Sequence, residues 1–167
     1  IHERLVGSEM CIRDRLVGAS GFVGTAILNE LLTREHKVTA VVRQPQKIGI
    51  KNPNLTVIKA DVSDTSTLIE ICKGKDAIIS AYNPGWSNPN IYDETLRNYP
   101  LILEAAKKSG VKRLLCVGGA GTLFCAPGLR VVDSGAIPDA IIGGVRSLGE
   151  FYLNILMNEK DICLLYT

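Results

Sequence analysis

Three glycines at three-residue intervals constrain this chain more than any other feature. Gly18, Gly21 and Gly24 lie where an apolar segment gives way to a helix-like pattern that continues to Leu32. Glycines allow a tight turn and a close approach of the backbone to a ligand. The N-terminus of the following helix presents unpaired N–H groups and a positive dipole end. The motif therefore predicts a loop that binds a diphosphate.

The residues on either side of the loop strengthen this interpretation. An apolar approach ends at Val17, and Lys37–Val42 has the pattern of a second strand after the helix. A strand, a glycine loop, a helix and a strand within roughly 30 residues form the unit that a dinucleotide site requires. We expect the cofactor to contact six residues of the loop and the first helical turn: Gly18, Ser20, Gly21, Phe22, Val23 and Gly24.

Short apolar runs alternate with helical patterns along the rest of the chain. Further strands are expected at 55–60, 77–81 and 113–117, and further helices at 65–73, 94–109 and 145–159, with loops near 83–90 and 126–138. Strands with nearly continuous apolar residues are typical of parallel sheets covered on both faces. The alternation predicts an α/β fold, a Rossmann-type doubly wound parallel sheet in three α/β/α layers.

Composition limits the classes of partner and site. The chain has 167 residues, of which 46% are hydrophobic, and a net charge of +2, with no run of five Lys or Arg residues. This argues for a single domain and against nucleic-acid binding.

Five cysteines without a C-x-x-C pair argue against a disulfide framework and a metal site, and favour a reducing cytoplasm. The sequence contains no apolar stretch of about 18 residues, the length that would indicate a membrane span. The expected partner is a small-molecule substrate, and the oligomeric state stays open.

The residues after the second strand indicate which dinucleotide is preferred. An NAD site usually places an acidic residue about 20 residues beyond the glycines, whereas an NADP site needs a cation for the 2′-phosphate. Arg43 follows the strand, Gln44 and Lys47 come next, and no acidic residue lies between His36 and Asp61. A guanidinium can bind phosphate through two hydrogen bonds and stack on adenine. We therefore expect NADP(H) rather than NAD(H), with a merely solvated Arg43 as the alternative.

Polar and small residues end the remaining strands. Asp61 follows the third strand, where its carboxylate could accept from the adenine amino group or could cap the helix expected from residue 65; both interpretations stay open. The other expected cofactor contacts lie at the carboxyl ends of the strands, which meet at the crevice where strand order reverses: Val62, Ala81, Tyr82, Asn83, Gly118 and Gly119. The glycine pair would let the nicotinamide half lie close to the backbone, unless it is only a loop without a ligand.

Five segments together resemble the atypical short-chain dehydrogenase/reductase family. They are GASGFVG (18–24), VVRQP (41–45), DVSD (61–64), SAYNPGW (80–86) and RLLCVGGAG (113–121). Within the family, the chain is similar to bacterial NAD(P)H-binding proteins of the NAD-dependent epimerase/dehydratase type, and to NmrA-like and flavin-reductase-like members. The resemblance covers roughly residues 16–161. It implies a Rossmann fold with NADP(H) along the glycine loop, Arg43 at the 2′-phosphate and Asp61 near adenine.

The same resemblance reveals a missing catalytic motif. Reductases of the main short-chain group use a serine and a Tyr-x-x-x-Lys pair for proton transfer. None of the five tyrosines here is followed by lysine at the fourth position, and glycine occupies the serine position. Tyr152 is therefore interpreted as a packing residue, and no catalytic residue is assigned. Direct hydride transfer would need only an acceptor beside the nicotinamide, and Tyr82, Asn83 and Trp86 are candidates for lining that pocket.

Three functions remain open at this point. The chain can be an NADP(H)-dependent oxidoreductase, a non-catalytic NADP(H)-sensing regulatory protein, or an inactive fragment without the substrate-side segment. The missing Tyr-x-x-x-Lys pair weakens the first interpretation without excluding it. No partner-binding motif in the sequence supports the second.

Both ends of the chain differ from the middle. Residues 8–15 (SEMCIRDR) and 163–167 (CLLYT) look like translated sequencing-adapter read-through. The expected organisation is a non-native leader over 1–11, an NAD(P)-binding Rossmann domain over 12–162 and a non-native tail over 163–167, with the fold truncated near its sixth strand. Asp14 and Arg15 fall in the first strand, which this fold buries on both faces. We expect their charges to lack partners, at a cost on the order of several kcal/mol.

Overall fold

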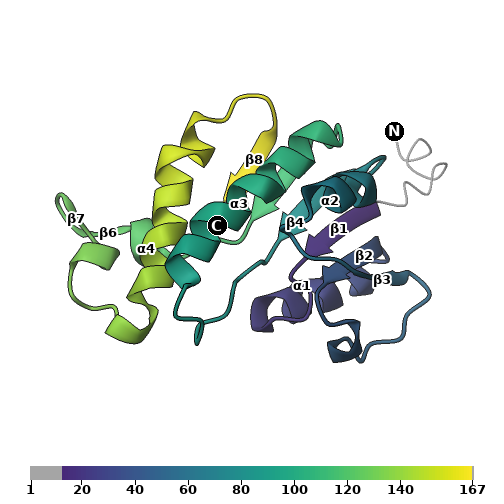
Figure 1. The fold of residues 1–167 in the computed structure, drawn as a ribbon, viewed down its shortest axis with the longest axis horizontal. Coiled ribbons are helices and arrows are strands. Elements are labelled where there is room, and N and C mark those ends of the chain that lie inside the picture. The colour runs from purple at the N-terminus through teal and green to yellow at the C-terminus, as the bar shows by residue number, and fades with distance from the viewer. Residues whose placement is uncertain (1–12, 167) are drawn as a thin grey trace, which may run out of the picture.

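Six parallel strands form the sheet on which the other elements are arranged, in the order β3-β2-β1-β4-β5-β8 (Figure 1). The computed structural model describes residues 13–166. The strands of this sheet are β1 (Arg13–Val17), β2 (Lys37–Val42), β3 (Leu55–Lys59), β4 (Ala77–Ser80), β5 (Arg113–Cys116) and β8 (Cys163–Tyr166). Strand order reverses between β1 and β4, which confirms the predicted doubly wound Rossmann-type sheet.

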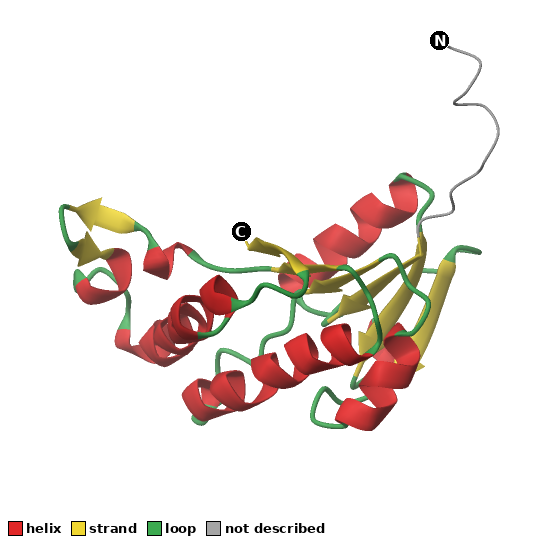
Figure 2. Cartoon of the chain, turned by 90° about the horizontal axis from the view of Figure 1, so that it is seen from above, coloured by secondary structure: helices red, strands yellow, loops and turns green. Residues whose placement is uncertain are grey.

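Helices cover both faces of this sheet, as Figure 2 shows from above. The α-helices are α1 (Phe22–Thr33), α2 (Thr65–Cys72), α3 (Ile91–Lys108) and α4 (Asp139–Asn154). The short 3₁₀ turns are η1 (Pro45–Lys47), η2 (Ala120–Thr122), η3 (Val131–Asp133) and η4 (Leu156–Asn158). Strands β6 (Phe124–Ala126) and β7 (Leu129–Arg130) form a separate hairpin that projects from the end of the molecule away from β1, β2 and β3. Within residues 13–166, no helix is long and apolar enough to cross a membrane.

Two apolar cores lie on opposite faces of the sheet. Leu16 packs with residues of α1, whereas its neighbour Val17 packs with residues of α2 and α3. Likewise, Val42 packs in the core that contains α1, and Val41 packs in the core that contains α2 and α3. Successive side chains of a strand point to opposite faces, so these apolar pairs explain why β1 and β2 lie in the middle layer.

Helix α4 begins six residues before the predicted start at 145, and the predicted loop over 126–138 contains β7 and η3. Glycine is a poor helix former, so Gly143 and Gly144 are unfavourable inside a helix on local propensity alone. In the structure, a Cβ on Gly144 would lie 2.6 Å from Ile91 Cδ1. The glycine allows α4 to pack closely against α3, so tertiary packing outweighs local propensity.

Asp14 and Arg15 of β1 are buried but have partners, so the expectation that their charges are unpaired is wrong. Asp14 is 2% exposed and Arg15 is 7% exposed. Asp14 Oδ2 lies 2.6 Å from His36 Nδ1, in the turn between α1 and β2. The Arg15 guanidinium donates to Thr39 Oγ1 on β2 and to the carbonyl oxygen of Ile71 on α2. Polar contacts with adjacent elements therefore compensate the burial.

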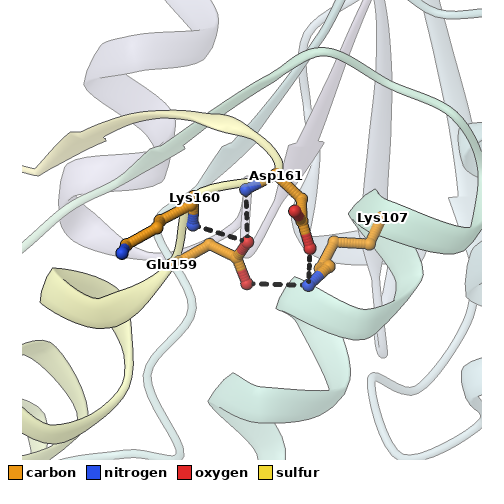
Figure 3. Close-up of polar contacts among 4 residues, drawn as sticks. All are labelled: Lys107, Glu159, Lys160 and Asp161. Atoms are coloured by element: carbon orange, nitrogen blue, oxygen red, sulfur yellow. Dashed lines mark hydrogen bonds and ion pairs between the residues drawn. The ribbon is translucent and has the colours of Figure 1, made fainter.

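The predicted leader over 1–11 lies outside the described residues. The predicted tail does enter the fold, because residues 163–166 form β8, which pairs in parallel with β5 from Arg113 to Cys116. Figure 3 shows the contacts that fix the turn before β8. Lys107 Nζ, near the end of α3, lies 2.9 Å from Glu159 Oε2 and 2.8 Å from Asp161 Oδ2.

Glu159 is the centre of this turn. Its other oxygen, Oε1, accepts hydrogen bonds from the backbone N–H groups of Lys160 (2.9 Å) and Asp161 (2.7 Å). The Asp161 N–H and the Lys107 ammonium hold the pKa of Glu159 below its usual value. A carboxylate with a lowered pKa stabilises the folded state at neutral pH, and this contribution is lost as the pH falls through that pKa.

The pairing of Asp14 predicts a non-additive pair of variants. His36→Ala leaves the buried carboxylate without its partner and should lower the free energy of unfolding by about 1 to 3 kcal/mol. Asp14→Ala combined with His36→Ala removes both groups and should recover part of this loss. Urea midpoints at constant slope measure both effects. A double variant less stable than His36→Ala alone would contradict the pairing.

The Glu159 turn predicts a pH-dependent effect. Glu159→Gln keeps an acceptor for the two backbone N–H groups but removes the charge opposite Lys107, so it should lower the urea midpoint at pH 7. The difference from the parent protein should shrink below about pH 4.3, the ordinary glutamate pKa, and vanish at lower pH. A difference that stays constant from pH 7 to pH 3 would show that the charge contributes nothing.

Candidate functional site

The glycine loop connects the end of β1 directly to α1. Gly18 has φ +81°, in the left-handed region, and its N–H donates to the carbonyl of Val41 (3.1 Å). The Gly21 N–H donates back to the Gly18 carbonyl (3.1 Å), and Gly21 is the N-cap of α1. No side chain within residues 13–166 caps this helix, so the N–H groups of its first turn remain available to an anion at the crevice.

The three glycines have different roles. A Cβ on Gly18 would lie 2.6 Å from the carbonyl oxygen of Ala81, and a Cβ on Gly24 would overlap the carbonyl oxygen of Gly18. These two positions therefore allow β1, β4 and α1 to approach one another. A Cβ on Gly21 would meet only the Gly18 carbonyl oxygen, at 3.5 Å. The space above Gly21 is not needed for packing, and Gly21 lines both cavities of the site.

The first cavity, the basic cavity, has a volume of about 460 Å³ and lies beside the carboxyl ends of β1 and β2. Its charged lining residues are Arg43 and Lys47, and Gln44 lies between them in the sequence. The remaining lining residues are Val17, Gly18, Ser20, Gly21, Val41, Val42, Ala60, Val62, Ala81, Tyr82, Asn83, Pro84 and Gly85. The predicted residues Ser20, Arg43 and Val62 are thus brought together in one cavity that carries positive charge.

Asp61 does not line either cavity. Its Oδ1 accepts from the backbone N–H (2.9 Å) and the hydroxyl (2.7 Å) of Ser63, and these hydrogen bonds, together with Arg43 and Arg97, lower its pKa. Asp64, not Asp61, caps α2 by accepting from the N–H and hydroxyl of Thr67. The capping interpretation of Asp61 is therefore wrong. Its contact with adenine stays a prediction.

The second cavity, the apolar cavity, has a volume of about 450 Å³ and lies between the glycine loop, the end of β5 and α4. It brings together the predicted residues Phe22, Val23, Trp86, Gly118 and Gly119. Gly21, Ala81, Tyr82, Asn83 and Gly85 line it from the side that it shares with the basic cavity. Sequence reasoning missed its other lining residues: Tyr99, Val117, Ala120, Gly121, Thr122, Ile137, Val145, Leu148 and Gly149.

Most of these missed residues lie on α3, α4 and the segment after β5, far along the chain from the glycine loop. Their apolar pattern indicates a buried face but not which cavity that face lines. For Gly121 a local signal existed, because it ends the glycine-rich segment after β5. Tyr152, by contrast, packs against the core beside α3 and lines neither cavity.

Tyr82 forms part of the wall shared by the two cavities. Its hydroxyl accepts from Asn98 Nδ2 (2.7 Å), and its carbonyl accepts from the Tyr99 hydroxyl (2.6 Å). The rings of Tyr82 and Tyr99 meet edge to face, with centroids 5.6 Å apart. Burial raises the pKa of Tyr82, so its phenol stays protonated at neutral pH. These contacts fix the end of β4 against α3.

The two adjoining cavities form a continuous site at the carboxyl ends of the strands, across the point where strand order reverses. This is where open α/β sheets bind dinucleotides. The basic cavity suits an adenosine half with phosphate, the glycine loop lies between, and the apolar cavity suits a nicotinamide half. In the part of the chain that the structure describes, no group of three or more His, Cys, Asp or Glu side chains is arranged to hold a metal ion.

Comparison with known proteins identifies the family. The sequence model of the NAD(P)H-binding family matches residues 18–136. A solved structure from Bacteroides thetaiotaomicron, described as a candidate epimerase, is 56% identical, with a TM-score of 0.87 over 93% of this chain and 69% of that one. A candidate NADH-flavin reductase from Streptococcus pneumoniae is 25% identical, with a TM-score of 0.75 over 93% of this chain and 70% of that one.

A curated relative gives the same assignment. The uncharacterized protein YwnB of Bacillus subtilis is 33% identical over 149 residues, which are 88% of this chain and 63% of YwnB. The chain therefore spans less than two thirds of that relative's length. From the glycine loop, the doubly wound sheet and these matches, it follows that this chain belongs to the NAD(P)H-binding family of atypical short-chain dehydrogenase/reductase proteins.

Proposed function

We propose that this protein binds NADP(H) across the two cavities and transfers hydride directly to a small molecule. The observation that carries the cofactor preference is the charge of the basic cavity. Arg43 and Lys47 line it at the end of β2, and none of its lining residues in the described part of the chain is acidic. An acidic residue there would bind the ribose hydroxyls of NAD and repel a 2′-phosphate. Two cations favour the phosphate instead.

The residues present fit the rest of the cofactor. The uncapped first turn of α1 offers N–H donors to the diphosphate, and the space above Gly21 leaves room for it. At the far side, a Cβ on Gly119 would meet no atom within 4 Å, so the backbone is open toward the apolar cavity. Gly118 and Gly119 would allow the nicotinamide half to lie close to the chain.

In the proposed reaction, bound NADPH supplies the hydride, and the protein provides binding and orientation. Gly21 and the first turn of α1 position the diphosphate, and the shared wall at Tyr82 separates the two halves of the cofactor. Phe22, Trp86 and Leu148 give the apolar cavity an apolar surface against which the nicotinamide half and an acceptor can pack. Packing against this surface would hold an acceptor near the hydride donor, which favours transfer.

A second candidate, NADP(H) sensing without catalysis, is supported by one specific observation. No Lys, His, Asp or Glu lines the apolar cavity among the described residues, so no strong acid or base faces the proposed nicotinamide position. Turnover with any acceptor separates the two candidates, because a sensor would bind NADPH without oxidising it.

The 2′-phosphate assignment predicts a selective loss of affinity. Arg43→Ala should weaken NADPH binding by about 1.5 to 3 kcal/mol, the range for hydrogen bonds to charged groups, and barely change NADH binding. The matched control is Arg34→Ala, because Arg34 is exposed on the far end of α1 and lines neither cavity. Fluorescence titration with both cofactors measures the effect. Equal losses for NADPH and NADH would overturn the assignment.

The glycine loop predicts that two similar substitutions have different effects. Gly21→Ala fits the fold, because its Cβ makes only an ordinary contact and its φ of −81° suits any residue. It should keep the urea midpoint but weaken NADPH at least tenfold, by about 1.4 kcal/mol or more. Gly24→Ala should instead lower the midpoint, since its Cβ would overlap backbone. If Gly21→Ala binds NADPH as the parent does, the loop is only a structural turn.

A further inference from the structure

We infer that the apolar cavity selects an uncharged, planar, conjugated hydride acceptor and rejects ligands that place a phosphate or carboxylate there. This inference rests on the proposed function, because it names the substrate class of the same site. It depends on three features of the cavity: the absence of charged lining residues, the engagement of its polar side chains, and the exposure of two aromatic rings at its surface.

The charges of the site are confined to the basic cavity. Arg43 and Lys47 line that cavity, whereas the side chains that line the apolar cavity within residues 13–166 include no Lys, Arg, His, Asp or Glu. An anionic group transferred from water into surroundings without a cation loses its hydration and gains no partner. The substrate part of the site therefore disfavours sugar nucleotides, phosphorylated compounds and carboxylates.

Most polar side chains of the apolar cavity already have partners within the protein. Asn83 Oδ1 accepts from the Gly85 N–H (2.7 Å). The Tyr99 hydroxyl donates to the Tyr82 carbonyl, and the Tyr82 hydroxyl accepts from Asn98. A ligand rich in hydroxyl groups would need donors and acceptors that these contacts occupy. An apolar ring with one or two carbonyl groups places fewer such demands on the cavity.

Two aromatic side chains offer ring surface to a planar ligand. Phe22, the first residue of α1, is 97% exposed, and Trp86, in the loop after β4, is 52% exposed. Both line the apolar cavity. When another flat ring covers an exposed aromatic ring, apolar surface is removed from water, and this is favourable. These two residues are therefore placed to bind the faces or edges of a conjugated ligand.

One edge of the Trp86 indole lies close to Gly144 on α4. A Cβ on Gly144 of α4 would lie 3.0 Å from Trp86 Cζ3. The missing side chain leaves room for one edge of the indole against the helix, while the rest of the ring stays half exposed. A ring that is fixed before binding loses little conformational entropy when a ligand packs against it.

The chemistry of hydride transfer favours the same class of acceptor. The C–H bond at the nicotinamide breaks, its hydrogen and electron pair form a new bond on the acceptor, NADPH is oxidised and the acceptor is reduced to an anion. That anion must take one proton to complete the reaction. No described lining residue is a strong acid, so the proton comes from water. A conjugated acceptor such as a quinone spreads the negative charge over its ring system until then, whereas a simple ketone would leave it on one oxygen.

Trp86 is the only tryptophan among the 167 residues, so its fluorescence reports on the cavity that it lines. The experiment titrates the full chain, saturated with NADP⁺, with three fused bicyclic probes. They are menadione, which is planar and uncharged; 2-hydroxy-1,4-naphthoquinone, which is planar and anionic at neutral pH; and 1-decalone, which is uncharged but not conjugated. We expect saturable quenching by menadione with a dissociation constant at least tenfold below those of the other two probes.

Two variants test the aromatic surface. Phe22→Ala should weaken menadione at least fivefold, because the exposed ring lines the apolar cavity and would no longer pack against the probe. The matched control is Phe124→Ala, since Phe124 is also an exposed phenylalanine but lies on the β6–β7 hairpin and lines neither cavity. It should leave menadione affinity unchanged.

The outcomes separate this inference from the proposed function. NADPH binding is measured independently by the fluorescence of its own nicotinamide. Failure to bind NADPH would overturn the proposed function, whatever the quinones do. Normal NADPH binding with equal affinities for menadione and the anionic quinone, or with no saturable quenching by menadione, would overturn the inference alone.

Discussion

The close approach between Gly24 and the Gly18 carbonyl is the constraint on which the rest of the site depends. Because Gly24 has no side chain, α1 can begin directly at the end of β1. The same contact aims the uncapped N–H groups of α1 at the crevice and presses the apolar face of the helix onto the β1–β2 core. A helix only slightly farther from the sheet would lose both the anion site and the packing. Binding and stability thus share one backbone contact.

Charge is distributed unevenly along the continuous site. The basic cavity carries its cations at the end of β2, and the apolar cavity is lined mostly by glycine, aliphatic and aromatic residues, with Asn83 and Thr122, and with no charged side chain in the described chain. Tyr82, fixed by Asn98 and Tyr99, lies on the wall between them. This difference favours one direction of binding for a ligand with a phosphorylated half and a neutral half. We propose that it orients the cofactor, and that the aromatic residues determine what can lie beside it.

Features encoded by neighbouring residues could be predicted, and features that depend on distant ones could not. The glycine loop, the order of strands and helices, and the position of Arg43 at the cavity followed from local patterns. The role of Asp61 did not, because Asp61 and Asp64 both precede α2 and the backbone geometry of the fold decides which carboxylate reaches Thr67. The partner of Asp14 could not be predicted for the same reason, because His36 lies 22 residues away in the sequence.

The sequence by itself determined the doubly wound fold and the glycine loop between β1 and α1, because apolar periodicity and glycine spacing act over a single turn or strand. Only the tertiary structure decided how the second cavity is built. It brings α4 onto α3 through Gly144, places Trp86 at the cavity, and leaves Tyr152 in the core. These contacts join residues that are far apart in the sequence, and their geometry is set by packing of the whole sheet and its helices. Residue patterns specify which faces are apolar, but side-chain packing across the sheet decides what those faces enclose.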